Sequence, residues 1–169
     1  MKGHYVEFEE FEDCTLNIFL KHLEHLEGIE LSDLKVSDLS MSNGKIVTPG
    51  EGVYLFRRGT EVLYVGKVSS MSFTERIGKH FDVRRYAWFN RFLKLIAEKV
   101  DEVDCKEDEY LIKALEYALK HCNLILINFK ERKRINKFET VLRRTTNPLN
   151  KFKHERRVDA TKRLVQFGN

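Results

Sequence analysis

The sequence has few cysteines, no long apolar run and no internal repeat, and the first two absences each exclude a class of protein. The cysteines are Cys14, Cys105 and Cys122. This odd, widely spaced set fits neither a disulfide framework nor a Cys-x-x-Cys zinc site, so we expect reduced, packed thiols. No apolar run approaches the roughly 20 residues that span a bilayer. The segment after Lys2 is acidic and unlike a signal peptide, so we expect a cytoplasmic protein with no membrane partner.

The chain has 169 residues, enough for one globular domain, and its charge is unevenly distributed. Residues 1–50 carry 4 basic and 10 acidic side chains, whereas residues 130–169 carry 13 and 4. A segment this basic attracts a polyanion such as nucleic acid, although a solvated helix face is the plainer alternative. The residues that we predict to contact nucleic acid are Lys133, Arg134, Lys137, Arg143, Arg144, Lys151 and Lys153.

Hydrophobic spacing predicts an α+β fold, in which a small three-stranded antiparallel sheet is flanked by helices and preceded by an N-terminal helical extension. Leu16 to Leu26 form an amphipathic pattern after Asp13, a plausible N-cap, and Ser72 begins a second helix. Further helices are expected around 88–96, 111–122, 135–142 and 154–166, and the third strand at 124–129. The predicted parts are an extension (1–50), a core (51–153) and a basic C-terminal helix or tail (154–169).

Two short segments, Gly52-Val53-Tyr54 and Tyr64-Val65-Gly66, mirror each other around a turn. A hairpin folded symmetrically about Gly59 would place Tyr54 opposite Tyr64 on one sheet face. A register shifted by one residue would instead move one tyrosine to the other face. Aromatic cross-strand pairs also commonly stabilise sheets, so the hairpin alone does not specify a site.

The two triplets are followed by Arg76, Glu139 and Asn150, and this order resembles the GIY-YIG nuclease superfamily over about residues 51–150. The resemblance implies a metal-dependent endonuclease that hydrolyses phosphodiester bonds of DNA. A chain with no recognisable second domain is most similar to restriction-like or phage and mobile-element members. Arg76 and His80 lie one helical turn apart, as in the Arg-x-x-x-His version of some restriction-type members.

The resemblance also implies a role for each matched residue. Tyr54 would be the general base or water-orienting group, and Tyr64 would support water or phosphate binding. We expect Lys67 and Arg76 to lower the pKa of one phenol, because a nearby cation favours the phenolate. Asn150 would brace the site, with Asn147 as a substitute because members ending in Pro-x-x-Asn place the asparagine one residue later.

The remaining roles follow from side-chain chemistry. Arg76 offers a charged, planar fork to a phosphate, and His80 can relay a proton near neutral pH. Glu139 would anchor Mg²⁺ or Mn²⁺, with water and phosphate oxygens as the other ligands. The alternative for Glu139 is a simple ion pair with Arg143 one turn later.

Two other functions stay open at this stage. A catalytically inactive nucleic-acid-binding module of the same fold would use only the basic residues, and a protein-interaction domain would use the acidic N-terminal helix. A single active site per chain cuts one strand, so double-strand cleavage would require a homodimer or repositioning on the DNA.

Overall fold

A computed structural model describes residues 3–42, 45–46, 50–100, 109–154 and 157–167; Cys105 lies outside these ranges. The strands are β1 (Tyr5–Glu7), β2 (Ile29–Glu30), β3 (Met41–Ser42), β4 (Lys45–Ile46), β5 (Gly52–Arg58), β6 (Glu61–Val68) and β7 (Asn123–Asn128). The α-helices are α1 (Leu16–His25), α2 (Phe73–His80), α3 (Arg91–Lys99), α4 (Tyr110–His121) and α5 (Arg132–Thr145). Short 3₁₀ helices are η1 (Phe8–Glu10), η2 (Val36–Leu39) and η3 (Leu164–Phe167).

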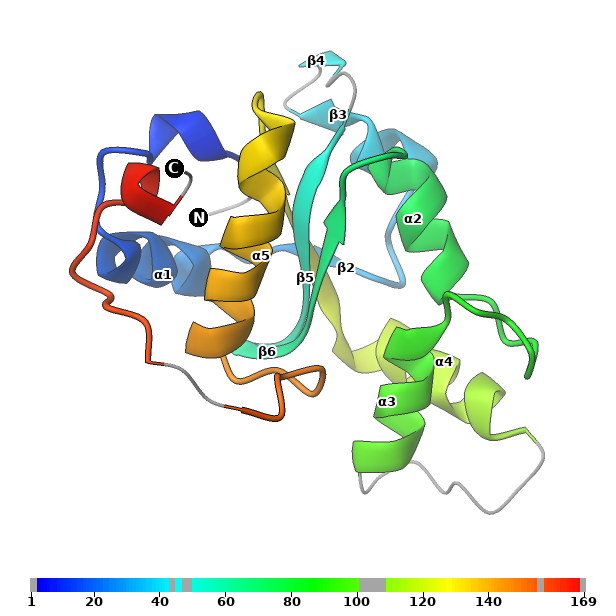
Figure 1. Cartoon of the computed structure of the whole chain (residues 1–169). Coiled ribbons are helices and arrows are strands. Elements are labelled where there is room, and N and C mark those ends of the chain that lie inside the picture. The colour runs from blue at the N-terminus through cyan, green and yellow to red at the C-terminus, as the bar shows by residue number, and fades with distance from the viewer. Residues whose placement is uncertain (1–2, 43–44, 47–49, 101–108, 155–156, 168–169) are drawn as a thin grey trace.

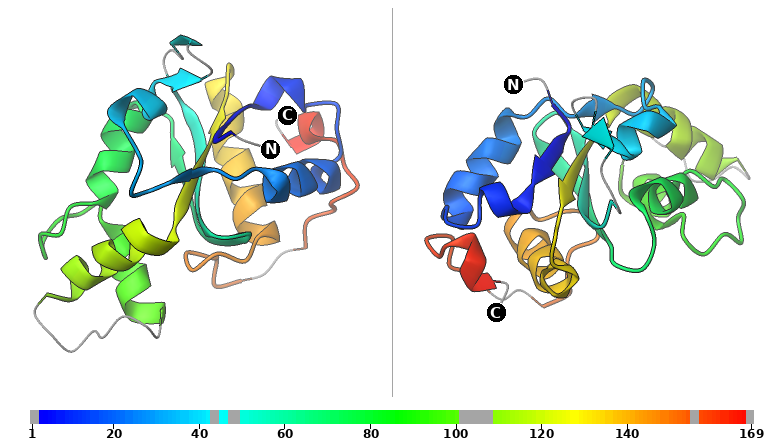
Figure 2. Two further views of the ribbon diagram at one scale, coloured as in Figure 1. Left: turned by 180° about the vertical axis from the view of Figure 1, so that it is seen from behind. Right: turned by 90° about the horizontal axis from the view of Figure 1, so that it is seen from above.

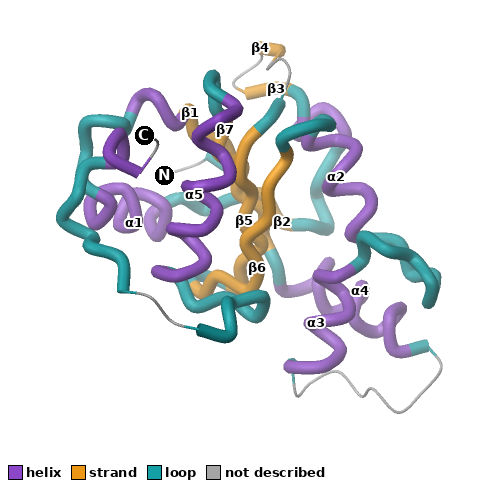
Figure 3. Tube along the Cα trace, in the orientation of Figure 1, coloured by secondary structure: helices purple, strands orange, loops and turns teal. Residues whose placement is uncertain are grey.

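A mixed sheet divides the molecule into two helical layers (Figures 1 and 3). Its order is β1-β7-β5-β6, and β2 also pairs with β7. The α+β class is confirmed, but the predicted three-stranded antiparallel sheet is wrong, because the sheet has five strands and β1 runs parallel to β7. The two additional strands come from residues 1–50 and are too short to show a period of two in the sequence.

The two faces of the sheet carry separate hydrophobic cores, because alternate residues of each strand point to opposite sides. Tyr54 and Phe56 pack with α2, α3 and α4. Val53 and Leu55 pack with α1, α5 and Phe8 of η1. The views in Figure 2 show α1, α5 and η3 together on one side of the strands and α2 to α4 on the other.

The hairpin register differs from the symmetric prediction. The β5–β6 turn leaves only Gly59 and Thr60 unpaired, and a β-bulge lies between Phe56 and Arg57. Together these features shift the pairing by two residues, so Tyr54 lies opposite Gly66 and not opposite Tyr64. A shift of two preserves the sheet face, and the two tyrosine rings still stack diagonally with centroids 6.2 Å apart.

The helix starts follow local capping. Ser72 caps α2 as predicted, its hydroxyl accepting a hydrogen bond from the Glu75 N–H at 3.2 Å. The N-cap of α1 is Thr15, not the predicted Asp13. The helix expected from residue 88 begins at Arg91, which leaves Trp88 in the preceding loop.

None of the helices in the described ranges has the length and apolar character needed to cross a membrane.

The predicted helix at 154–166 is wrong for the described residues, since only η3 is helical there. The carbonyls of Ala160 and Lys162 accept hydrogen bonds from the N–H groups of Asn17 and Leu16, and the Leu164 N–H bonds to Cys14 O. Backbone groups that pair with the start of α1 are not free to form helical hydrogen bonds.

Candidate functional site

Both glycines of the mirrored triplets occupy positions where a side chain has no room. A Cβ on Gly66 would lie 2.1 Å from Tyr54 Cζ and 2.2 Å from its hydroxyl oxygen. A Cβ on Gly52 would lie 1.9 Å from the Ile127 carbonyl oxygen. The Tyr54 ring therefore lies directly over Gly66 of β6. The strand β6 is at the edge of the sheet.

The Tyr54 hydroxyl is held from two sides by α2. His80 Nε2 lies 2.5 Å from the phenol oxygen, and Arg76 Nε donates to the same oxygen at 3.3 Å. Because the guanidinium can only donate, we assign the phenol O–H as donor to a neutral His80 that carries its proton on Nδ1. The Nδ1 atom is buried and has no hydrogen-bond partner among the described residues.

Burial determines the protonation of this cluster. It raises the pKa of Tyr54, and Arg76 offsets only part of that rise. It likewise raises the pKa of Tyr64, again partly offset by Arg76. Burial, with a contribution from Arg76, lowers the pKa of His80 to about 3. Arg76 thus acts in the expected direction, but the expectation of a lowered phenol pKa is wrong, because desolvation of the charged form outweighs the attraction of Arg76.

Glu139 reaches the site from α5, on the other face of the sheet. Its side chain is 8% exposed; Oε1 accepts from Arg143 Nη1 at 3.2 Å, and Oε2 lies 3.9 Å from Lys67 Nζ. The charge of Glu139 contributes to the raised pKa of both Tyr54 and Tyr64. The predicted carboxylate is therefore both paired with Arg143 and electrostatically coupled to the two phenols.

Glu139 by itself would have to hold a metal ion, because the side chains that contact it, Arg143 and Lys67, are cations. No three His, Cys, Asp or Glu side chains within the described ranges could together hold a metal ion. A single carboxylate completed by water and phosphate oxygens fits Mg²⁺ or Mn²⁺, which are often held by one or two carboxylates with substrate phosphates. The Oε2 atom is the available one, because its contact with the 42%-exposed Lys67 side chain is long.

Asn150 braces the strand that carries Tyr64. Its Nδ2 donates to Val65 O at 2.7 Å, and its Oδ1 accepts from Val65 N at 3.2 Å. Arg143 Nε donates to the Asn150 carbonyl at 3.0 Å, so one arginine connects the brace to Glu139. The alternative residue, Asn147, instead has a positive φ of 49° and bonds with Lys151.

The predicted nucleic-acid contacts do not form one set. The Arg134 side chain is 11% exposed and pairs with Glu12 and Glu131, and Lys133 also pairs with Glu131. Among the others, Lys137, Arg144, Lys151 and Lys153 are exposed. The exposed set, and not Arg134, is available to phosphates.

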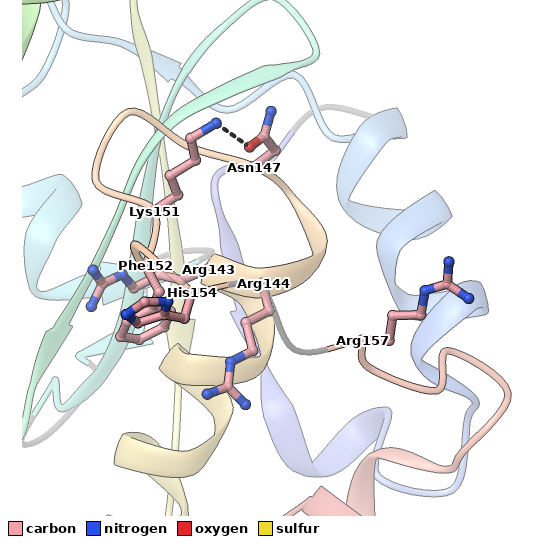
Figure 4. Close-up of a pocket in the computed structure, with 7 residues that line it drawn as sticks. All are labelled: Arg143, Arg144, Asn147, Lys151, Phe152, His154 and Arg157. Carbon is pink, nitrogen blue, oxygen red and sulfur yellow. Dashed lines mark hydrogen bonds between the residues drawn. The ribbon is translucent and has the colours of Figure 1, made fainter.

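A basic pocket of about 270 Å³ lies at the end of α5 and includes Arg143, the ion-pair partner of Glu139 (Figure 4). Its lining residues are Arg143, Arg144, Asn147, Lys151, Phe152, His154 and Arg157. The guanidinium of Arg143 lies 3.9 Å from the centre of the Phe152 ring, and that of Arg144 lies 5.3 Å from it. The lining residues that the structure describes include no carboxylate, so the pocket suits an anion.

The sequence reading did not assign two aromatic residues of this region to the site. Phe152 packs against the Arg143 and Arg144 guanidinium groups, and Phe89 lies 4.9 Å below that of Arg76. An aromatic residue among basic ones is a weak signal for Phe152, whereas the contact of Phe89 with α2 depends on how the loop folds back.

No family model, curated protein or solved structure matches this chain. The site therefore has to be interpreted from its own geometry. Five of the seven predicted catalytic residues make polar contacts with another of the seven. Tyr54 contacts Arg76 and His80, and Glu139 contacts Lys67. Tyr64 joins by ring stacking on Tyr54, and Asn150 joins through Arg143.

Proposed function

We propose that this chain is a metal-dependent DNA endonuclease of the GIY-YIG type, which hydrolyses phosphodiester bonds. The observation that carries the proposal is the Tyr54 hydroxyl, hydrogen-bonded to His80 and Arg76, whose pKa is also raised by the charge of Glu139. A buried phenol and imidazole, a half-buried guanidinium and a carboxylate that acts on the pKa of the phenol combine the functions that hydrolysis requires. The resemblance in motif order supports the same conclusion.

Activation of the attacking water is assigned to Tyr54 and His80. The phenol oxygen accepts a hydrogen bond from water, while its own proton moves to His80 Nε2 along the short existing hydrogen bond. The water proton ends on the Tyr54 oxygen, and the new O–P bond forms as the bond to the leaving oxygen breaks. A bound phosphodiester brings negative charge beside His80, which raises the pKa of His80 and makes this transfer feasible.

Charge on the phosphoryl group is stabilised by Arg76, whose guanidinium stays protonated at any relevant pH, and by Lys67. Glu139 would hold the metal ion, which when bound supplies Lewis-acid stabilisation of the phosphate and leaving oxygens. The flanking DNA phosphates would lie in the basic pocket beside Arg144 and Lys151.

The test is conversion of supercoiled plasmid to nicked and linear forms in Mg²⁺, with an EDTA control. We expect Glu139→Gln to lose about a hundredfold or more of the cutting rate, since a catalytic metal contributes several kcal/mol. The matched control is Glu131→Gln, which removes an exposed carboxylate at the start of the same helix. Full activity in Glu139→Gln would reject the metal assignment.

A second function is favoured by the Glu139–Arg143 ion pair together with the basic pocket. A nucleic-acid-binding module that does not cut would keep both features. In that case several unmodified and methylated DNAs would be bound in a salt-sensitive way without being cut, and Glu139→Gln would leave binding unchanged.

A further inference from the structure

The loop at 82–90, between α2 and α3, presents large apolar side chains to solvent. Four of the seven large hydrophobic side chains that are exposed in the described part of the chain lie here: Val83, Tyr86, Trp88 and Phe89. Trp88 is 92% exposed and Tyr86 is 87% exposed. In Figures 1 and 3 this loop projects from the molecule beside α2. Clustered exposed aromatic rings mark a binding surface.

The loop is held in place from behind. The buried Asn90 donates through Nδ2 to the carbonyls of Asp82 and Arg84, at 2.8 and 3.1 Å. Lys94 on α3 donates to the Ala87 carbonyl at 3.0 Å. A backbone fixed in this way presents its rings with little loss of conformational entropy when a ligand binds.

The rings are surrounded by cations. The guanidinium of Arg76 lies 4.9 Å, and the ammonium of Lys79 5.1 Å, from the centre of the Phe89 ring. Arg84 and Arg85 are exposed in the loop itself. The one carboxylate of the loop, Asp82, is paired with Arg84 at 2.6 Å. Flat apolar faces among cations complement a nucleobase joined to a phosphate backbone.

We propose that loop 82–90 is a stacking platform for unpaired bases of the DNA that is cut. Bases within a duplex are already stacked and cannot reach these rings, so the preferred substrate carries single-stranded or unpaired nucleotides beside the scissile phosphate. Arg76 provides the connection, because its Nε bonds to the Tyr54 hydroxyl while its guanidinium lies over Phe89. The statement that the bound bases lie next to the scissile phosphate rests on the proposed function. The statement that the loop binds unpaired bases does not.

Trp88 is the only tryptophan of the chain, so its fluorescence reports on this loop directly. The full-length protein is titrated in EDTA, where no cutting occurs, with a short oligothymidylate, a duplex with a central unpaired bubble, and a blunt duplex of equal phosphate concentration. We expect quenching by the first two and little by the third.

The variant arm uses anisotropy of the same labelled DNAs. Base stacking contributes about 1–3 kcal/mol, so Trp88→Ala should weaken binding of the oligothymidylate about tenfold or more, with duplex binding unchanged. Tyr86→Ala should act in the same direction. Ile18→Ala is the matched control, since Ile18 is 55% exposed on α1 across the sheet.

The possible results separate this inference from the proposed nuclease activity. Quenching in a protein that never cuts would support the platform and reject the nuclease. Plasmid cutting without quenching, and with unchanged affinity in Trp88→Ala, would overturn the platform alone. A change from dimer to monomer in Trp88→Ala, with single-strand binding intact, would also overturn it and assign the loop to contact between copies.

Discussion

At the scale of single residues, the site depends on the lack of a Cβ atom at Gly66. The Tyr54 ring occupies the space where any residue larger than glycine at position 66 would place its Cβ. This close approach puts the phenol within reach of His80 and Arg76. The glycine of the second triplet is therefore part of the positioning of Tyr54.

We predict that Gly66→Ala abolishes plasmid cutting and destabilises the fold by about 1–3 kcal/mol, the usual range for overpacking a core. The added methyl group would displace Tyr54 from His80. Gly78→Ala is the control: Gly78 lies on α2 with open space around its Cβ position, so the variant should keep full activity. Nicking rates and urea unfolding measure both variants. An active Gly66→Ala would contradict this positioning role.

The buried His80 predicts a pH dependence of stability. Its pKa is about 3 in the folded protein and near 6.5 when unfolded, so the unfolded chain binds more protons between these values. The free energy of unfolding should therefore fall as pH drops below 6.5, by up to about 1.4 kcal/mol per pH unit from this group.

The measurement is urea unfolding from pH 7.5 to 4.5 for the wild type and for His80→Gln, as the difference cancels the titration of carboxylates. The slope difference should appear below about pH 6.5. Parallel curves would mean that His80 titrates as freely in the folded protein as in the unfolded chain.

At the scale of elements, a buried arginine connects α1 to the sheet. Arg57 donates to the carbonyls of Leu23 and Leu26, each at 2.6 Å, and to Asn123 Oδ1 at 3.1 Å. The first two carbonyls lie at the C-terminal end of α1, where helix carbonyls lack partners and a positive charge is favourable. Arg57 thus caps a helix that is distant in sequence.

Replacing Arg57 by Met should destabilise the protein by about 1–3 kcal/mol, because the Leu26 carbonyl loses its Arg57 donor, whereas the Leu23 carbonyl keeps the Leu26 N–H. Arg58→Met is the comparison: the neighbouring Arg58 pairs with Glu61 and donates to the Tyr117 hydroxyl at 2.6 Å, but its side chain is 39% exposed, so it should contribute about 1 kcal/mol. Chemical denaturation of both variants measures the difference. Equal losses would show that the cap is energetically unimportant.

At the scale of the whole molecule, residues 1–50 belong to the same sheet as the site. They supply β1 and β2, which both pair with β7, and α1 covers one face of the sheet with Phe19 and Leu23. Removing them would uncover one of the two hydrophobic cores. Residues 1–50 and residues 51–153 therefore share one sheet and one of its two hydrophobic cores.

We predict that the fragment 51–169 lacks a cooperative unfolding transition, since it loses the cover of Val53, Leu55 and Ile125. Adding residues 1–50 as a separate chain should restore the transition, which can be followed by circular dichroism during urea unfolding. A fragment that unfolds cooperatively on its own would show that the N-terminal segment is separable.

The sequence alone determined the features that depend on local spacing. The β5–β6 hairpin, the α2 cap at Ser72, the β7 strand and the order of Tyr54, Arg76 and Glu139 could all be predicted, because turn chemistry, capping and hydrophobic period act within a few residues. These features were sufficient to predict the α+β class, whereas the candidate site residues were selected by the resemblance in motif order.

Only the tertiary structure decided the features that depend on distant neighbours. The bulge set Tyr54 opposite Gly66, Arg57 became buried under α1, and residues 5–7 and 29–30 joined the sheet through β7. The directions of the pKa shifts of Tyr54 and His80 also appeared only there. Desolvation and long-range pairing depend on which surfaces meet, and one sequence does not encode this in its local pattern.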